Sequence, residues 1–229
     1  MGRLLRVMPL CAGVLCLGVG LLIVGCGGGG KTRFQFVNAV PDLTNLDLLI
    51  DSTSVASNVA YGTTTGYQNT KSGSHNIQIE SSGTSNSLLQ QSITFASGAD
   101  TTIIASNFSS NISALVLNDN NSAPPSGDFN LRLVNVSPGL GATDVYIVAP
   151  GTDINTVASP TVSNLAFNSS TSYQSVTAGS YDIILTLAGQ KIVAIDTGSL
   201  SFSAGQVRTF VGLNNPSGGF SYAVLSDLN

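Results

Sequence analysis

Two stretches of this sequence follow the same pattern, and this internal repeat constrains the fold more than any other feature. Residues 34–41 read FQFVNAVP and align with residues 131–138, which read LRLVNVSP. Further segments align in the same order, with an insertion around Pro150, Gly151 and Pro160 in the second copy. They pair 47–50 with 144–147, 58–61 with 164–167, 67–68 with 173–174, 73–79 with 179–185, 95–98 with 202–205 and 115–119 with 223–227. The repeat predicts two tandem copies of one domain.

Each copy is expected to be all-β. Segments such as 33–37, 76–80, 182–187 and 207–213 are short and rich in Ile, Val, Thr and Phe, and several alternate apolar with polar residues. Clusters of Gly, Asn, Ser, Pro and Asp separate them at intervals of about ten residues, which is typical of antiparallel sandwiches. We therefore predict two tandem immunoglobulin-like antiparallel β-sandwich domains, at residues 33–120 and 129–229. The linker at 121–128 contains Pro124 and Pro125, which stiffen it.

Residues 1–25 are expected to form a lipoprotein signal peptide. Arg3 and Arg6 precede an uncharged stretch that ends in Gly25 and Cys26. This ending resembles the bacterial lipobox, whose cysteine becomes the lipidated first residue of the mature protein. An uncleaved membrane helix is the alternative, because the stretch is long enough to span a bilayer. Glycines within the stretch and the small residue before the cysteine favour the signal peptide, and both interpretations export the rest of the chain.

Lipidation at Cys26 would tether the mature protein to a membrane, since two or more acyl chains hold a protein stably. Residues 26–32 then act as a short tether, in which Gly27 to Gly30 are flexible. By resemblance to lipoprotein sorting in Gram-negative bacteria, Gly27 in place of Asp favours the outer membrane. The predicted location is therefore the bacterial cell envelope.

Composition limits the chemistry that the folded part can perform. All three cysteines lie at positions 11, 16 and 26, so the two domains have no disulfide, thiol nucleophile or cysteine-based metal site. The chain has 12 Asp and Glu against 8 Lys and Arg, and Arg3 and Arg6 belong to the leader. Such an acidic, charge-poor chain is not expected to bind nucleic acid, which needs a basic surface. We expect no cofactor.

The candidate site residues are few. Asp42, Asp47 and Asp51 are weak candidates for a metal site, because carboxylate oxygens suit a hard cation such as Ca²⁺. Only the middle acid recurs in the second copy, as Asp144, and an Asp that accepts hydrogen bonds from nearby backbone is the alternative interpretation. The one histidine, His75, aligns with Tyr181, which favours a structural role over a catalytic one.

The repeated opening segment resembles the bacterial surface family known as domain of unknown function 4397. The family pattern runs approximately Val-Asn-Ala-Ser-Pro-Asp-Ala, followed by Val-Asp-Val-Tyr-Val-Asp-Gly. The matching residues are Val37, Asn38, Ala39, Pro41, Asp42 and Asp47 in the first copy and Val134, Asn135, Ser137, Pro138, Asp144, Val145 and Tyr146 in the second. The resemblance implies an exported, often lipid-anchored β-rich protein, and it implies no activity.

Two function classes remain. The favoured one is a non-catalytic envelope lipoprotein that acts as a binding, adhesion or structural module, anchored to the membrane through Cys26. Its Asn-, Ser- and Thr-rich loops would contact a polysaccharide or an envelope protein, with added avidity if both copies bind. The alternative is a lipid-anchored periplasmic or surface hydrolase with an unrecognised Ser/Asp site. A pocket in which Asp, Ser and His75 converge would favour that alternative.

Overall fold

The computed structural model describes residues 1–2 and 31–228, and these fold almost entirely into strands. The first half contains β1 (Arg33–Asn38), β2 (Asn45–Ile50), β3 (Thr53–Ala60), β4 (Gln68–Asn69), β5 (Gly73–Ser81), β6 (Ser87–Phe95), β7 (Asp100–Ser106) and β8 (Ser113–Asp119). The second contains β9 (Asp128–Asn135), β10 (Thr143–Val148), β11 (Val162–Leu165), β12 (Ser169–Ser170), β13 (Gln174–Thr177), β14 (Gly179–Leu187), β15 (Val193–Phe202), β16 (Val207–Asn214) and β17 (Phe220–Leu228). Two 3-10 turns, η1 (Ser109–Asn111) and η2 (Ile154–Thr156), lie in loops. The predicted all-β class is confirmed.

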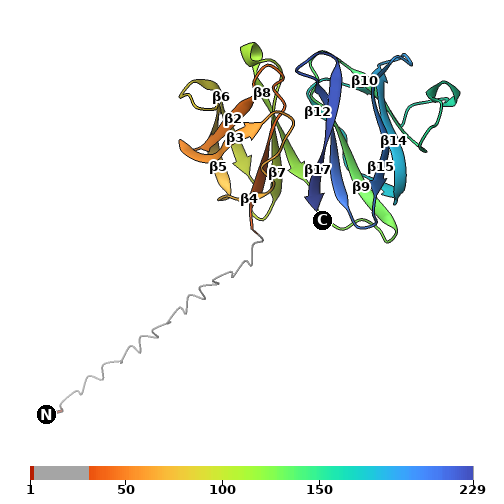
Figure 1. The fold of residues 1–229 in the computed structure, drawn as a ribbon. Helices are drawn as coiled ribbons and strands as arrows, with labels where there is room; N and C mark the ends of the chain where they lie inside the picture. The colour runs from red at the N-terminus through yellow and green to blue at the C-terminus, as the bar shows by residue number, and fades with distance from the viewer. Residues whose placement is uncertain (3–30, 229) are drawn as a thin grey trace.

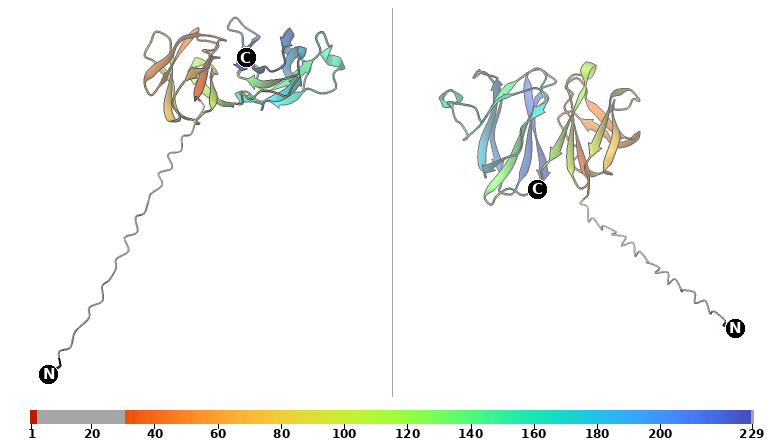
Figure 2. Two further views of the ribbon diagram at one scale, coloured as in Figure 1. Left: turned by 90° about the horizontal axis from the view of Figure 1, so that it is seen from below. Right: turned by 180° about the vertical axis from the view of Figure 1, so that it is seen from behind.

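Each half is a sandwich of two sheets, and the two halves share one strand order. The first domain pairs a sheet of order β4-β1-β7-β8 with a sheet of order β3-β2-β5-β6. The second pairs β12-β9-β16-β17, in which β13 also joins β9, with β11-β10-β14-β15. We call the sheets that contain β1 and β9 the inner sheets, because they lie in the middle of the molecule with the outer sheets flanking them (Figures 1 and 2).

One strand pair in each inner sheet is parallel, which differs from the expected purely antiparallel sheets. β1 pairs with β7 in parallel, and β9 pairs with β16 in the same way. The reason lies in the path of the chain. After β1 the chain leaves for the outer sheet, and β6 returns it to the end where β1 began, as the hydrogen bond from Arg33 N to Ala99 O at 3.0 Å shows. β7 must therefore run in the direction of β1.

The two sheets of the first domain enclose a core built by alternation along the strands. In β2 the side chains of Leu46, Leu48 and Ile50 are buried, and the residues between them are partly exposed. Phe34 and Phe36 on β1 face the same core. The second domain has its own core, which contains Phe129, Leu131, Leu133, Val145, Ile183, Leu185, Phe202 and Phe210.

A third apolar core lies between the two domains. It joins Val37, Ala39, Ile104 and Leu117 of the first domain to Val134, Val136, Val211, Leu213 and Leu225 of the second. The inner strands are therefore buried on both faces, and β7 and β16 have almost unbroken runs of buried residues. A large apolar interface of this kind opposes independent domain motion.

The insertion in the second domain covers part of its outer sheet. Ile154 in η2 packs with Tyr146 and Ile184, which point away from the domain core. The ammonium group of Lys191 holds this loop by donating to the carbonyl oxygens of Ile154 at 2.9 Å, Asn155 at 3.1 Å and Val157 at 2.6 Å. The insertion is thus a fixed cap.

The start of β1 and the end of β17 lie at one end of the molecule (Figure 1), which we call the proximal end. The contacts agree, because Arg33 pairs with Asp100, and Gln35 contacts Asp227 near the end of β17. The loops that follow β1 and β7 lie at the opposite, distal end, where Asp42 accepts a hydrogen bond from Ser109 N at 2.9 Å. Within residues 31–228, no helix is long and apolar enough to cross a membrane.

Candidate functional site

β1 and β9 each send one long polar side chain into the interface between the inner sheets. Phe34 and Phe36 face the core of their own domain, so Gln35 between them faces the other domain. Arg132 takes the corresponding place on β9. Gln35 is 0% exposed and Arg132 is 2% exposed. Because a buried charge is unfavourable unless it is paired, the partners of these side chains define the site.

The two side chains contact corresponding partners across the interface. Arg132 donates from Nη2 to Oδ1 of Asp119 at 2.7 Å. Gln35 donates from Nε2 to Oδ1 of Asp227 at 3.0 Å. Asp119 ends β8, and Asp227, which aligns with it in the repeat, is the next-to-last residue of β17. The contacts are therefore reciprocal, as in a two-fold interface. We call these four residues the interdomain lock.

Hydroxyl groups of the same domain hold each carboxylate in place. Oδ2 of Asp119 accepts hydrogen bonds from Thr102 Oγ1 and from the hydroxyl of Tyr67, both at 2.7 Å. The donors to Oδ2 of Asp227 are Thr209 Oγ1 and the hydroxyl of Tyr173, the latter at 2.8 Å. Both carboxylates are thus fully engaged in hydrogen bonds, which is how proteins accommodate buried charges.

The lock contains two carboxylates and one guanidinium. Burial raises the pKa of Asp227, and the nearby Asp119 adds to this effect, although the Thr209 hydrogen bond and Arg132 oppose it. Arg132 lies closer to Asp119, at 2.7 Å, than to Asp227, at 4.0 Å. Gln35 is neutral, so it does not pair with Asp227 as Arg132 pairs with Asp119, and the other cation that interacts with Asp227 is Arg208. Asp227 is therefore the electrostatically weaker member of the lock.

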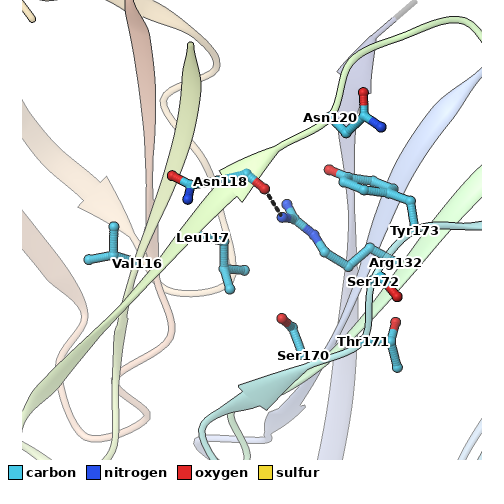
Figure 3. Close-up of a pocket in the computed structure, with 9 residues that line it drawn as sticks. All are labelled: Val116, Leu117, Asn118, Asn120, Arg132, Ser170, Thr171, Ser172 and Tyr173. Atoms are coloured by element: carbon cyan, nitrogen blue, oxygen red, sulfur yellow. Dashed lines mark hydrogen bonds between the residues drawn. The ribbon is translucent and has the colours of Figure 1, made fainter. Parts of the chain in front are cut away.

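A cleft of about 360 Å³ opens beside the lock, between β8 and residues 170–173 of the second domain (Figure 3). Arg132 reaches across it, with its guanidinium carbon 4.6 Å from the centre of the Tyr173 ring. The same guanidinium donates to Thr209 Oγ1 at 3.0 Å and to the carbonyl oxygen of Asn118 at 3.4 Å. The guanidinium thus forms its hydrogen bonds with other residues of the protein, and we assign the cleft to the interdomain lock.

The asparagine of the repeated opening segment joins the two sheets of each sandwich. Asn38 donates from Nδ2 to the carbonyl oxygen of Val59 at 3.0 Å, and its Oδ1 accepts from Val40 N at 3.1 Å. Asn135 makes the corresponding contacts with Leu165 and Ser137, both at 3.1 Å. Both asparagines are fully buried. The two asparagines therefore hold the two sheets of each sandwich together.

The aspartate that recurs in both copies, Asp47 and Asp144, also has a structural role, because it joins two neighbouring strands. Asp47 accepts a hydrogen bond from the backbone N of Asn58 at 2.6 Å, and Asp144 accepts one from Asn164 N at 2.7 Å. Asn58 and Asn164 have positive φ angles of 60° and 54°, so the carboxylate fixes an irregular place in the neighbouring strand. The expected backbone contact is present, but it reaches the next strand instead of a local turn.

The structure does not bring the three metal candidates together. Asp42 accepts hydrogen bonds from Ser109 at the distal end, and Asp47 contacts Asn58 N and the Ser82 hydroxyl. Asp51 lies at the other end of β2 and accepts hydrogen bonds from Asn76 N and His75. In the described part of the chain, no three His, Cys, Asp or Glu residues gather as a metal site would require.

His75 and Tyr181 each pack against a phenylalanine of their own domain, and these two phenylalanines do not correspond in the repeat. Its ring lies 5.7 Å from the ring of Phe95, and the Tyr181 ring lies 6.1 Å from that of Phe129. Nδ1 of His75 lies 2.6 Å from Oδ2 of Asp51, while Nε2 has no hydrogen-bond partner among the described residues. A serine nucleophile would have to contact Nε2, so this pair does not favour the hydrolase alternative.

Cys26, the expected lipidation site, lies outside the described residues.

Sequence reasoning missed the interdomain lock. The signal was present in the aligned repeats, where Gln35 and Arg132 interrupt apolar segments at one position, and Asp119 and Asp227 recur at another. A polar residue that recurs within apolar strands on both sides of a repeat points to a buried polar contact.

Comparison with known proteins gives a family for the chain. Among solved structures, it is similar to the crystal structure of CBMbc (family CBM26) from Eubacterium rectale Amy13K in complex with maltoheptaose. The identity is 10%, the match covers 86% of this chain and 98% of that one, and the TM-score is 0.27, too low to support an inference. No curated protein matches. Residues 32–146 match the family model "Domain of unknown function (DUF4397)", and the chain belongs to that family.

Proposed function

We propose that this protein is a lipid-anchored bacterial envelope protein whose two domains form one rigid, non-catalytic head for binding, adhesion or assembly. The observation that carries the proposal is the reciprocal lock, in which Arg132 contacts Asp119 and Gln35 contacts Asp227. Together with the apolar core between the inner sheets, it joins both domains into one body. A rigid head presents its loops in a fixed arrangement, which lowers the entropic cost of binding.

The anchor is proposed at Cys26, on the sequence pattern that ends in Gly25 and Cys26. The tether would enter the head at the proximal end, where β1 begins. The distal loops would then point away from the membrane, as a binding surface should. In a Gram-negative cell, Gly27 after the cysteine favours the outer membrane.

We also propose that the second domain is another copy of the family domain. The family match ends at residue 146, within β10. The shared strand order and the corresponding roles of Asn38 and Asn135 support a second copy. The partner is proposed to be a polysaccharide or an envelope protein, and nucleic acid is not expected because the chain is acidic.

Metabolic labelling with a palmitate analogue tests the anchor. Wild type should incorporate the label and remain with the membrane fraction, whereas Cys26→Ala should do neither. Equal labelling of both proteins would overturn the anchor. Crosslinking on intact cells, followed by recovery of the protein, tests the binding head: recovery of a glycan or an envelope protein supports it, and recovery of neither from cells that carry the protein contradicts it.

A further inference from the structure

The distal end of the first domain contains a polar pocket that is separate from the interdomain lock. It has a volume of about 430 Å³ and lies between the loop after β1, the end of β3 and the turn after β5. Its polar side chains belong to Asp42, Thr44, Asn45, Asn58, Ser81 and Ser82. The volume falls within the range of small-molecule sites, roughly 300–1,000 Å³.

The second domain shows which of these side chains the fold needs. The two backbones match here: Ser82 N donates to Asn45 O at 3.2 Å, and Ala188 N donates to Ala142 O at 3.2 Å. Asn58 recurs as Asn164 because both serve the scaffold aspartate. The other polar residues do not recur. Asp42, Thr44, Asn45, Ser81 and Ser82 correspond to Gly139, Gly141, Ala142, Leu187 and Ala188.

One corner of the second domain is occupied by the Asn214 side chain. A Cβ atom at Gly139 would lie 2.9 Å from Nδ2 of Asn214, so Asn214, whose Oδ1 accepts a hydrogen bond from Gly139 N at 3.1 Å, would have to shift. In the first domain, Asp42 occupies the corresponding place, and its carboxylate accepts hydrogen bonds from Ser109 N at 2.9 Å and Ser109 Oγ at 2.6 Å. The same scaffold thus has a hydrogen-bonding carboxylate in one domain and a glycine in the other, and the neighbouring polar residues are replaced by Gly, Ala and Leu.

Several polar groups in the pocket have no partner within residues 31–228. Thr44 Oγ1, Ser81 Oγ and Asn45 Oδ1 take part in no hydrogen bond there, while Asn45 Nδ2 donates to Asn58 Oδ1 at 2.8 Å. This contact orients the Asn45 carbonyl without occupying it. The pocket therefore offers a held amide and two free hydroxyl groups beside the Asp42 carboxylate.

The charge of the pocket selects among ligands. Among the described residues that line it, none is Lys, Arg or His, and Asp42 is acidic. Phosphate, sulfate and uronic acid groups would meet a carboxylate with no compensating cation. An apolar ligand would leave the amide and hydroxyl groups unpaired. Neutral hydroxyl groups both donate and accept hydrogen bonds, which is what this lining requires.

We infer that this pocket binds a neutral, hydroxyl-rich glycan segment, and that the second domain lacks such a site. The inference rests on the proposed binding head and names its ligand class and its contact residues, Asp42, Thr44, Asn45 and Ser81. It does not depend on the anchor. A single site also means that the tandem domains supply rigidity to the head and no avidity for the glycan.

The test uses the full-length chain in detergent, fluorescently labelled, on an array of neutral oligosaccharides of hexoses and N-acetylhexosamines. Sulfated and uronic-acid oligosaccharides are printed beside them. Asn45→Ala and the triple variant Asp42→Gly/Thr44→Gly/Asn45→Ala replace first-domain residues by the residues at the corresponding positions of the second domain. Gln90→Ala, which removes an exposed amide on the outer face of β6, is the matched control. Circular dichroism melts check that every variant folds.

Wild type and Gln90→Ala should bind at least one neutral glycan equally well, and neither should bind the acidic glycans. Asn45→Ala should weaken binding roughly fivefold to tenfold, the order expected for one lost hydrogen bond, and the folded triple variant should not bind. Absence of neutral glycan binding, preference for acidic glycans, or full binding by the triple variant would overturn the inference, as would an envelope protein found as the sole ligand. Cys26→Ala should bind as wild type does, so failure of the anchor and failure of the site are distinguishable.

Discussion

Arg132 of the second domain donates from Nη2 to Asp119 Oδ1 of the first domain at 2.7 Å, and the two side chains are 3% and 0% exposed. Arg132 is the cation of the lock, and it compensates two buried carboxylates. Gln35, its counterpart on β1, is neutral. The asymmetry of this otherwise reciprocal contact gives two matched substitutions with opposite expected effects.

Arg132→Gln should strongly destabilise the folded protein. It removes the guanidinium that pairs with Asp119 at 2.7 Å and leaves Arg208 as the cation that interacts with Asp227. Removal of one partner of a buried ion pair costs about 3–5 kcal/mol. Urea unfolding followed by circular dichroism measures the loss.

Gln35→Arg is the converse variant, because it gives the interdomain lock a second cation, placed where Gln35 contacts Asp227. The new arginine should lower the pKa of Asp227 and preserve or raise stability at neutral pH. If Arg132→Gln unfolds at the same urea concentration as wild type, the lock does not contribute as described.

The pH dependence of stability should reveal Asp227. Its pKa is raised above the ordinary value of 3.8, first by burial. In the window between 3.8 and the raised pKa, the folded state binds more protons than the unfolded state at this site. The contribution of Asp227 to the unfolding free energy therefore falls as the pH rises through this window.

The difference between wild type and Asp227→Asn reports on this site together with its coupling to Asp119 and Arg132, while distant groups cancel. Asp51 acts in the opposite sense, because the hydrogen bonds from Asn76 N and His75 lower its pKa. Unfolding free energies measured from pH 3 to pH 8 should show wild type losing stability relative to Asp227→Asn as the pH rises. A constant difference across the range would contradict the raised pKa.

Asn38→Ala tests the structural role of the family asparagine. The substitution leaves the buried Val59 carbonyl and Val40 N–H without partners, at a cost of about 1–3 kcal/mol for each group. Asn86→Ala, at an exposed turn position, is the control and should change stability by about 0.5 kcal/mol or less. Equal melting temperatures for the two variants would show that Asn38 does not hold the sheets together.

Lys191→Met should loosen the cap on the second domain without unfolding it. The variant keeps an apolar stem but loses the three carbonyl contacts in the loop around η2. Hydrogen exchange at the Val157 amide, which donates to Ile154 O at 3.1 Å, should accelerate. The exposed Lys71→Met should leave exchange unchanged. Unaltered protection of the Val157 amide in Lys191→Met would contradict this role of Lys191 and mean that the apolar contacts of Ile154 hold the cap in place.

Much of the fold could be predicted from the sequence, because the repeat and the strand alternation are local signals. Leu46, Leu48 and Ile50 alternate with polar residues and lie in the core, as the pattern indicates. The parallel pairing of β1 with β7 depends on the path of the whole chain, and no local pattern records it.

The candidate site was less accessible from the sequence. Asp42, Asp47 and Asp51 look equivalent in the sequence. In the structure, Asp42 precedes β2, Asp47 lies near its start and Asp51 follows its end, and each contacts different residues. The role of Arg132 depends on Asp119, which belongs to the other domain. Only the three-dimensional arrangement shows that the apolar runs of the inner strands are buried against a second sandwich.

The most direct test of the central claim, that the two domains form one rigid body, is a distance measurement between them. Spin labels on cysteines introduced at Gln90 in β6 and Ser199 in β15, in a chain whose Cys11, Cys16 and Cys26 are replaced by alanine, report on the two outer sheets. Double electron–electron resonance should give one narrow distance distribution, which Arg132→Gln broadens. A broad distribution in the chain with Arg132 intact would show that the domains move independently and would contradict the account.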